Sequence, residues 1–528
     1  MLRRITITAA TLAITGLAAW MILDVVGPAR ATKPERTYAG SEPAAAFPTA
    51  VTWMNTGGRA LSLEDLRGKV VLLDFWSYGC IGCFHVVQDL KRLEEKYGPA
   101  LAIIGVHAGR HARERETPAI RNILARYELD FPVVNDRDLA FRDAYRAETL
   151  PTLVFIDPDG RFVGSVVGDG HFDLLDAVVG GLIDEFEKAG GIDRTPLPRE
   201  PERPPPVDSP LRFPGDVLAD ETGGRLFIAD SNNHRIVVAD LDGRILKVIG
   251  GQSAGSEDGD FASAEFRYPQ GLTLADPNTL YVADARNNTI RRVDLAAERV
   301  QTVAGTRTRV LQVENAGAAG STGLNSPWDV LWHDGLLYIA MAGQHQLWIL
   351  DPRERQLRAF AGTRRAELLD GPLLEAGLNQ PSSLATDGVR LFVADAEADA
   401  IRVMAFDPGS SISTLVGPPP LRADGVRARD PAIEHPLGVA WLGDRVVVAD
   451  TYNHRIRILD PSTGKMRTLV SEDAGLDEPA GVSVAAGRIY VADTNNHRIV
   501  SVDPESGAVT PVRLRYAAPG DIRGRARQ

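Results

Sequence analysis

The chain has very little cysteine: Cys80 and Cys83 are the two cysteines among its 528 residues. Two thiols cannot build a disulfide framework, a four-cysteine zinc site or an iron–sulfur cluster. The sequence also lacks an excess of positive charge, because 58 Lys and Arg stand against 70 Asp and Glu. A net charge of −12 repels phosphate polymers, so no nucleic acid is expected as a partner.

A long uncharged run lies near the beginning of the chain. Arg3 and Arg4 precede a mostly apolar stretch from Ile5 to Leu23, and the breaker pair Gly27-Pro28 follows it. This order is typical of an export signal, with a small-x-small cleavage site at residues 29–31. Because the run is just long enough to cross a bilayer, residues 1–31 are predicted to be a cleaved signal peptide or a membrane anchor. The rest of the chain is then expected outside the cytoplasm, periplasmic or secreted.

A length of 528 residues predicts several domains at about 150 residues each. Within residues 47–190, short β-rich runs alternate with helical patterns, which predicts a small α/β domain. Strands are expected at 70–75, 101–106, 131–134, 152–156 and 162–167, and helices at 80–97, 118–127, 139–145 and 172–187. Residues 32–46 are expected to link the leader to this domain, and the Pro-rich residues 191–210 to form a stiff spacer with few contacts.

Residues 211–515 repeat one pattern six times, ahead of a short basic tail at 516–528. The repeats begin near six prolines: Pro214, Pro269, Pro327, Pro381, Pro436 and Pro479. Each repeat has a hydrophobic triplet, which runs into Ala-Asp in five repeats and into Met341 in the third. Repeats of this length with about four short strands each predict the blades of an all-β propeller, and six blades close a ring.

These repeats resemble NHL repeats. The resemblance is clearest in Ala229-Asp230-Ser231-Asn232-Asn233-His234-Arg235-Ile236 and in residues 449–456 and 492–499, whereas three repeats lose the His-Arg pair. It implies a propeller that binds a partner, here expected to be a protein. The recurring Asp and His are expected to be structural, because a catalytic site need not recur in every blade. The acidic residues 257–260 lack the further oxygens of an EF-hand, so they are expected to connect strands.

Cys80 and Cys83 come after the predicted strand 70–75 and at the beginning of the predicted helix 80–97. Free N–H groups and the helix dipole stabilise a thiolate at a helix N-terminus, so Cys80 is the predicted nucleophile. Cys83 lies one turn further and deeper, where it can attack a mixed disulfide at Cys80. This chemistry is that of a thiol–disulfide oxidoreductase, and it needs no cofactor.

Around this pair the chain is similar to the thioredoxin family, especially to its exported, membrane-tethered members. Asp74-Phe75-Trp76 precedes Cys80-Ile81-Gly82-Cys83 at the family's spacing, and Leu150-Pro151-Thr152-Leu153 matches the segment with the family's cis-proline. The resemblance implies that Cys80, Cys83 and Asp74 are catalytic, with Asp74 taking a proton from Cys83. It also implies a substrate-binding groove that involves Trp76, Leu150 and Pro151.

Two departures from the thioredoxin pattern leave the direction of electron flow open. Gly79 stands where the family usually has Trp, and Ile81-Gly82 stands where it usually has Gly-Pro. These changes alter thiol exposure and reduction potential.

Other uses of the cysteine pair fit less well. Haem attachment needs His directly after the second cysteine, where Phe84 stands, and the Pro and Thr of a peroxiredoxin site are missing. Cu(I) capture by a metallochaperone stays open, with His85, His107 or His111 as further ligands, because soft thiolates favour Cu(I). A redox-silent scaffold whose propeller binds a protein partner also stays open. The favoured hypothesis is disulfide exchange on exported client proteins that the propeller recruits, with no metal site.

Overall fold

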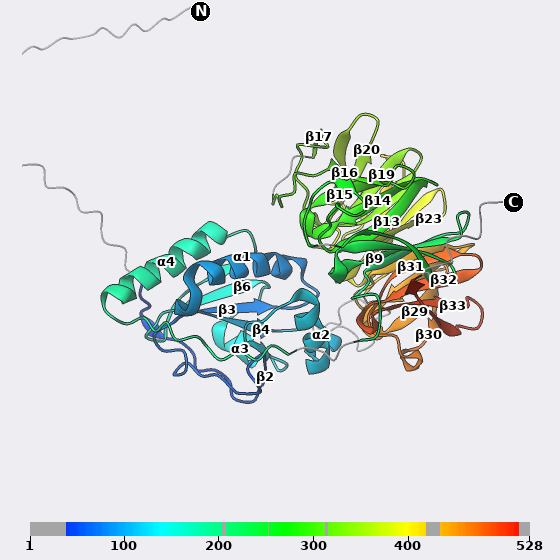
Figure 1. Cartoon of the computed structure of the whole chain (residues 1–528). Coiled ribbons are helices and arrows are strands. Elements are labelled where there is room, and N and C mark those ends of the chain that lie inside the picture. The colour runs from blue at the N-terminus through cyan, green and yellow to red at the C-terminus, as the bar shows by residue number, and fades with distance from the viewer. Residues whose placement is uncertain (1–37, 203–206, 252, 312–314, 419–432, 517–528) are drawn as a thin grey trace, which may run out of the picture.

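The structure is a computed structural model that describes residues 38–202, 207–251, 253–311, 315–418 and 433–516. The predicted leader, residues 1–31, lies outside these residues. Figure 1 shows an α/β domain packed against a ring of β-blades. The predicted fold class, an α/β domain followed by a six-bladed all-β propeller, is confirmed. Within the described ranges, no helix is both long and apolar enough to cross a membrane.

The α/β domain is built on a seven-stranded sheet with the order β1-β7-β6-β3-β4-β5-β2. Its strands are β1 (Glu42–Pro43), β2 (Thr52–Met54), β3 (Val70–Trp76), β4 (Leu101–His107), β5 (Val133–Asn135), β6 (Thr152–Ile156) and β7 (Arg161–Val167). Its helices are α1 (Ile81–Tyr97), α2 (Thr117–Tyr127), α3 (Ala140–Tyr145) and α4 (Phe172–Lys188). Every helix and strand predicted for this domain forms, with ends within two residues of the prediction.

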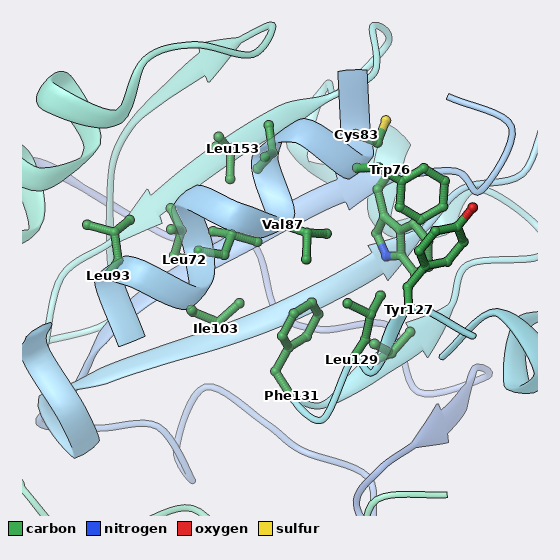
Figure 2. Packing of buried hydrophobic residues seen from close by; sticks show 14 of the residues in the cluster. Leu72, Trp76, Cys83, Val87, Leu93, Ile103, Tyr127, Leu129, Phe131 and Leu153 are labelled. Carbon is green, nitrogen blue, oxygen red and sulfur yellow. The ribbon is translucent and has the colours of Figure 1, made fainter. Parts of the chain in front are cut away.

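The central strand β3 explains how the two faces of the sheet are filled. Side chains alternate along a strand, so Val70, Leu72, Asp74 and Trp76 face one side and Val71, Leu73 and Phe75 face the other. The first side packs against α1, α2 and α4, and Figure 2 shows its apolar residues with Cys83 and Trp76 at one end. The second side packs against α3. This double burial holds the end of β3 and the beginning of α1 in fixed positions.

The sheet domain extends beyond the boundaries expected from the sequence. β1, within the expected linker 32–46, pairs with the edge strand β7. Residues of the expected spacer also pack on the domain: the buried Lys69 ammonium donates to Asp193 O at 3.0 Å and to Thr195 O at 2.6 Å. The spacer was expected to make few contacts, and this part differs because its carbonyl groups satisfy a buried charge.

Each propeller blade is an antiparallel sheet built from consecutive strands. Blades 1 to 3 consist of β8 (Asp216–Asp220), β9 (Arg225–Asp230), β10 (Arg235–Asp240) and β11 (Arg244–Gly250); β13 (Pro269–Asp276), β14 (Thr279–Asp284), β15 (Thr289–Asp294) and β16 (Arg299–Ala304); and β18 (Pro327–His333), β19 (Leu336–Met341), β20 (Gln346–Asp351) and β21 (Gln356–Ala361). Blades 4 to 6 consist of β23 (Pro381–Thr386), β24 (Arg390–Asp395), β25 (Ala400–Ala405) and β26 (Ser411–Val416); β27 (Gly438–Leu442), β28 (Arg445–Asp450), β29 (Arg455–Leu459) and β30 (Met466–Val470); and β31 (Pro479–Ala485), β32 (Arg488–Asp493), β33 (Arg498–Val502) and β34 (Val509–Val512). The short strands β12 (Gly259–Asp260), β17 (Ala316–Ala318) and β22 (Gly371–Pro372) extend blades 2 to 4.

The ring closes between blades 6 and 1. β35 (Arg515–Tyr516) leaves blade 6 and pairs in parallel with the outer strand β11 of blade 1. Thr494 Oγ1 donates to Pro214 O at 2.9 Å across the same junction. Residues up to Tyr516 therefore belong to the propeller, and the rest of the predicted tail lies outside the described residues.

Two buried carboxyl groups join neighbouring blades on the innermost strands. Asp216 Oδ2 accepts the N–H of Leu272 at 3.1 Å, and Asp329 Oδ2 accepts the N–H of Leu384 at 2.7 Å. Burial raises the pKa of Asp329 to about 7. Burial and the neighbouring Asp329 raise the pKa of Asp216 well above its ordinary value.

The recurring Asp of the repeats has a structural role, as expected. In three blades it forms a buried ion pair with an arginine seven residues later: Asp284–Arg291 at 2.8 Å, Asp395–Arg402 at 2.9 Å and Asp450–Arg457 at 3.0 Å. In blade 3 the buried, apolar Met341 and Trp348 occupy the equivalent positions. Asp258, in the acidic segment 257–260, accepts from Arg291 and Thr302, which fits the expected connection between strands.

Candidate functional site

Cys80 and Cys83 form a disulfide at the beginning of α1, with their Cα atoms 5.3 Å apart. Cys80 is the N-cap residue, and its Sγ accepts the N–H of Cys83 at 3.1 Å. Cys80 is partly exposed and Cys83 is fully buried. This arrangement matches the predicted order of an outer and an inner thiol.

Asp74 lies two residues before the end of β3 and shares with Leu72 and Trp76 the face that packs on α1. Its side chain is 1 % exposed, and its Oδ1 has no hydrogen-bond partner within the described ranges. Burial raises the pKa of Asp74 to about 8. A carboxyl group with such a pKa can exchange a proton near neutral pH.

Leu150 and Pro151 lie beside the disulfide, where the sequence placed them. The peptide bond between them is cis, and both residues line the same cleft as Cys80. A Cβ atom added to Gly82 would lie 3.5 Å from Pro151 Cδ and 4.0 Å from Cys80 Sγ. Pro151 and the disulfide are therefore near neighbours.

Trp76 does not line this cleft, which corrects its predicted role in substrate binding. Its side chain is 1 % exposed and packs edge-on against Phe84 and His107. The alternation of β3 turns Trp76 inward, beneath α1. Its contribution is to the packing that supports the site.

The cleft above Cys80 has a volume of about 680 Å³, and the two domains share its walls. The α/β domain contributes the disulfide region and the loop with Pro151. Blades 3 and 4 contribute residues that include His345, Asn379, Gln380 and Glu397. This second wall was not predicted from the sequence.

Six propeller residues on the face toward the α/β domain share one position, directly before the first proline of each repeat. All six have a left-handed backbone, with φ between 47° and 63°: Phe213, Tyr268, Ser326, Gln380, His435 and Glu478. This conformation is uncommon for residues other than glycine and needs support from the surroundings.

The NHL signature supplies that support in every blade. The residue at the signature His position accepts the N–H of the next pre-proline residue, and the six pairs are His497–Phe213, His234–Tyr268, Asn288–Ser326, His345–Gln380, Asp399–His435 and His454–Glu478. Where the repeats lack His, Asn288 and Asp399 still offer an acceptor oxygen. The signature therefore has a structural role, and it presents six different side chains on one face.

Several of these side chains contact the α/β domain around the first turn of α1. Gln380 Oε1 accepts the N–H of Ile81 at 2.9 Å, and Ser326 Oγ lies 2.7 Å from His85 Nε2. His85 Nδ1 lies 2.6 Å from Asp169 Oδ2. The propeller thus accepts a hydrogen bond from the N–H of Ile81, one of the N–H groups beside Cys80 that the helix leaves without a partner.

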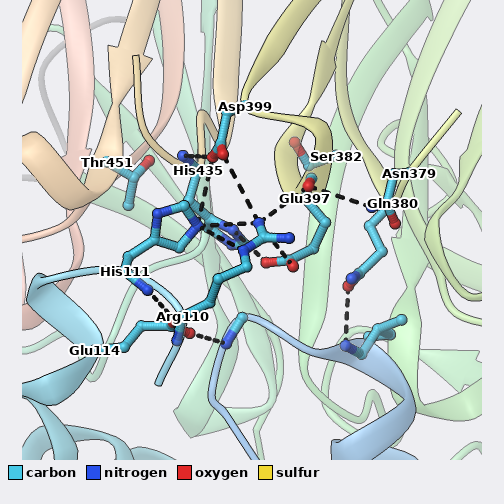
Figure 3. Close-up of polar contacts among 12 residues, drawn as sticks. Arg110, His111, Glu114, Asn379, Gln380, Ser382, Glu397, Asp399, His435 and Thr451 are labelled. Atoms are coloured by element: carbon cyan, nitrogen blue, oxygen red, sulfur yellow. Dashed lines mark hydrogen bonds and ion pairs between the residues drawn. The ribbon is translucent and has the colours of Figure 1, made fainter. Parts of the chain in front are cut away.

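A polar network joins the domains next to the cysteines (Figure 3). Arg110 Nη2 lies 3.0 Å from Glu397 Oε2 and 3.8 Å from Asp399 Oδ2. Burial alone would raise the pKa of Glu397, but contacts with His435 and Arg110 hold it below its ordinary value. Burial, followed by the charge of Glu397, raises the pKa of Glu114. Opposite charges are therefore held together at the domain interface.

Gly79 lies where side chains of the propeller approach the α/β domain closely. A Cβ atom at this position would lie 2.4 Å from Glu397 Oε1 and 3.1 Å from both Glu114 Oε1 and Tyr452 Oη. Glu114 Oε1 also accepts the Gly79 N–H at 3.1 Å. A tryptophan, which the thioredoxin pattern usually has here, would collide with blade 4.

The histidines considered for copper binding have other surroundings. His85 contacts Asp169 and Ser326, and the fully buried His107 packs against Trp76 and Tyr78. His111 lies against Tyr452. In the described part of the chain, no group of three or more His, Cys, Asp or Glu side chains is arranged to hold a metal ion.

Comparisons with known proteins agree with this architecture. Residues 68–162 match the thioredoxin-like family, and residues 211–239 and 476–500 match the NHL repeat. The chain is 38 % identical over 443 residues to Protein SUPPRESSOR OF QUENCHING 1, chloroplastic, of Arabidopsis thaliana, which covers 80 % of this chain and 42 % of that protein. It is 36 % identical over 461 residues to NHL repeat-containing protein 2 of Bos taurus, which covers 80 % of this chain and 63 % of that protein.

A third similarity is confined to the α/β domain. The chain is 32 % identical over 120 residues to the thiol-disulfide oxidoreductase ResA of Bacillus cereus, which covers 22 % of this chain and 66 % of that protein. The chain spans less than two thirds of the length of each of these relatives.

Proposed function

We propose that this protein is a thiol–disulfide oxidoreductase whose cleft is shared by both domains. The proposal starts from its architecture, a thioredoxin-like domain joined to a six-bladed NHL-repeat propeller. The observation that carries this proposal is the arrangement of Cys80 at the N-terminus of α1, Cys83 buried one turn further, and Asp74 buried on the same side of the sheet. The resemblance of the α/β domain to an oxidoreductase supports it.

The proposed exchange uses both cysteines in turn. In the reducing direction, the Cys80 thiolate attacks a client disulfide, forms a mixed disulfide and releases one client thiolate. Cys83 then loses its proton to Asp74 and attacks Cys80 Sγ. The Cys80–Cys83 disulfide forms, the second client sulfur leaves as a thiolate, and two electrons have passed to the client. The oxidising direction is the same sequence in reverse.

A redox titration of the full chain tests this proposal. The protein is equilibrated in glutathione buffers, and free thiols are alkylated and counted. We expect a single reversible two-electron transition. Cys80→Ser should abolish exchange, whereas Cys83→Ser should trap mixed disulfides with clients. Absence of an oxidised form at any potential, or identical behaviour of the two variants, would contradict the assigned roles.

We also propose that the propeller recruits the protein clients. Support comes from the cleft itself, in which His345, Asn379 and Gln380 lie opposite Pro151. Asn379→Ala should then reduce the trapping of clients by the Cys83→Ser protein and leave reduction of a small aromatic disulfide unchanged. The control is Arg358→Ala, which changes an exposed residue of the outer strand of blade 3. Equal loss on both substrates would exclude a recruiting role.

The proposed place of action is outside the cytoplasm, with residues 1–31 as signal peptide or anchor. The proposal rests on Arg3, Arg4 and the uncharged run that follows them. Fusion of residues 1–46 to a reporter enzyme that is active only after export tests it. An inactive fusion that is nevertheless expressed would overturn it.

A further inference from the structure

A second cavity lies at the domain interface, on the other side of the first turn of α1 from Cys80. It has a volume of about 190 Å³ and is enclosed by α1, α2 and blades 2 and 3. Four aromatic side chains line it: Phe84 and Tyr127 from the thioredoxin-like domain, and Tyr268 and Trp328 from the propeller. Ile81 and His85 line both this cavity and the cleft above the disulfide.

Arg286 contributes an unsatisfied positive charge to this cavity. Its Nη2 atom is buried and has no hydrogen-bond partner, and no carboxylate of the described residues lies within ion-pair distance of it. Arg309, which also lines the cavity, is already paired with Asp169. Burial lowers the pKa of Arg286, and the positive charges of Arg126 and Arg267 add to this effect. The guanidinium is partly exposed to the cavity and has no ion-pair partner among the described residues, so an anion would be stabilised beside it.

The two tyrosines hold this guanidinium in a defined orientation. The Cζ atom of Arg286 lies 3.9 Å from the ring centroid of Tyr268 and 4.8 Å from that of Tyr127. Tyr268 is itself fixed, because its Oη donates to Arg126 O at 3.2 Å and its N–H donates to His234 Nδ1 at 3.3 Å. Contacts with aromatic faces leave the N–H edge of a guanidinium as the part that can bind a ligand, and this edge suits a planar carboxylate.

We propose that this cavity binds a small aromatic carboxylate, with its carboxylate against Arg286 and its ring against the aromatic walls. The volume fits a ligand of about the size of benzoate, and the walls supply the apolar contact that such a ring requires. The rest of the polar lining is Gln88, Gln270, Asn288, Ser326, His85, Arg267 and the carboxylate of Asp89. Asp89 lies 3.7 Å from Arg92, so a positive charge already faces this carboxylate. Because the walls come from both domains, the bound ligand also bridges the domain interface.

Calorimetric titration of the oxidised full chain tests this proposal without any thiol chemistry. The probes are benzoate, its neutral isostere benzamide, and acetate, which has the charge but no ring. We expect saturable binding of benzoate and at least about tenfold weaker binding of the other two. Equal binding of benzamide, or no saturable heat from benzoate up to about 10 mM, would overturn the proposal.

Two variants locate the binding. Arg286→Met should weaken benzoate binding at least about tenfold, whereas Arg358→Met, which changes an exposed arginine of the outer strand of blade 3, should not. Ala285→Leu fills the cavity and keeps Arg286, so it should also abolish binding even if the arginine variant does not fold. Unchanged affinity in Ala285→Leu would refute the site. The oxidoreductase proposal does not depend on the outcome of these binding experiments, because the redox titration tests it separately.

Discussion

Replacement of Asp74 by Asn separates the charge of this residue from its shape. Asp74 is fully buried without a charged partner, and its pKa rises from 3.8 to about 8. The folded protein therefore keeps a proton that the unfolded chain releases between these two values. The contribution of Asp74 to stability is most favourable below pH 3.8, falls as the pH rises, and stops falling above about pH 8. A neutral Asn does not have this pH dependence.

The size of the effect follows from the pKa shift. Between pH 3.8 and pH 7 lie about three pH units, each worth about 1.4 kcal/mol, so Asp74 costs the folded state about 4 kcal/mol at pH 7. Asp74→Asn should therefore stabilise the thioredoxin-like domain by up to that amount at pH 7 and change little at pH 4. Amide hydrogen exchange of β3 in the oxidised full chain measures this difference locally.

The same substitution should impair catalysis. Asn cannot take the proton of Cys83, so release of the mixed disulfide should slow more than the first attack by Cys80. The exposed Asp138→Asn serves as control and should change neither quantity. A stability difference that is the same at pH 4 and pH 7 would refute the assigned ionisation state of Asp74, and an unchanged pH–rate profile would refute its role in proton transfer.

Three further predictions concern the interface and the propeller. Gly79→Ala should weaken the domain interface by about 1–3 kcal/mol, because its Cβ would collide with Glu397. Faster alkylation of reduced Cys80 would show this weakening, whereas an unchanged alkylation rate would contradict the close approach of the two domains. Met341→Asp should destabilise the propeller by about 3–5 kcal/mol in chemical denaturation, and adding Trp348→Arg should recover part of the loss; purely additive effects would contradict the equivalence with the Asp–Arg pairs of other blades. Asp329, with a pKa of about 7, should make the propeller less stable as the pH rises from 4 to 7, and thermal unfolding of Asp329→Asn should show a smaller slope; an unchanged slope would assign the effect to other groups.

The elements of both domains could be predicted from the sequence because their signals are local. Alternation along β3 and the repeated prolines depend on residues that are close in the chain. The positions of Cys80, Cys83 and Pro151 followed from the spacing of one known motif. The inward turn of Trp76 was missed, although its place on the same face of β3 as Leu72 was a usable signal.

The second wall of the cleft could not be predicted because its contacts are long-range. Ile81 and Gln380 are 299 residues apart, and one hydrogen bond between them leaves no periodic trace. The pre-proline positions did carry a weak signal: Pro recurs in each repeat, whereas the residue before it varies among Phe, Tyr, Ser, Gln, His and Glu. The backbone at this position is the same in all six repeats, but each side chain meets a different part of the α/β domain. The residue type is therefore expected to vary.

Two of the departures from the thioredoxin pattern lie at the contact with the propeller. A side chain at Gly79 would meet the carboxylate of Glu397 in blade 4, and the N–H of Ile81 is bound by Gln380. Two of the three changed positions, Gly79 and Ile81, therefore face the propeller, whereas Cys80, Cys83, Asp74 and Pro151, which the proposed chemistry needs, keep the family's residue types. Loss of redox function would not be expected to concentrate changes at a domain contact. The altered motif is better explained as adaptation to a cleft with two walls, and this weakens the argument for a redox-silent scaffold.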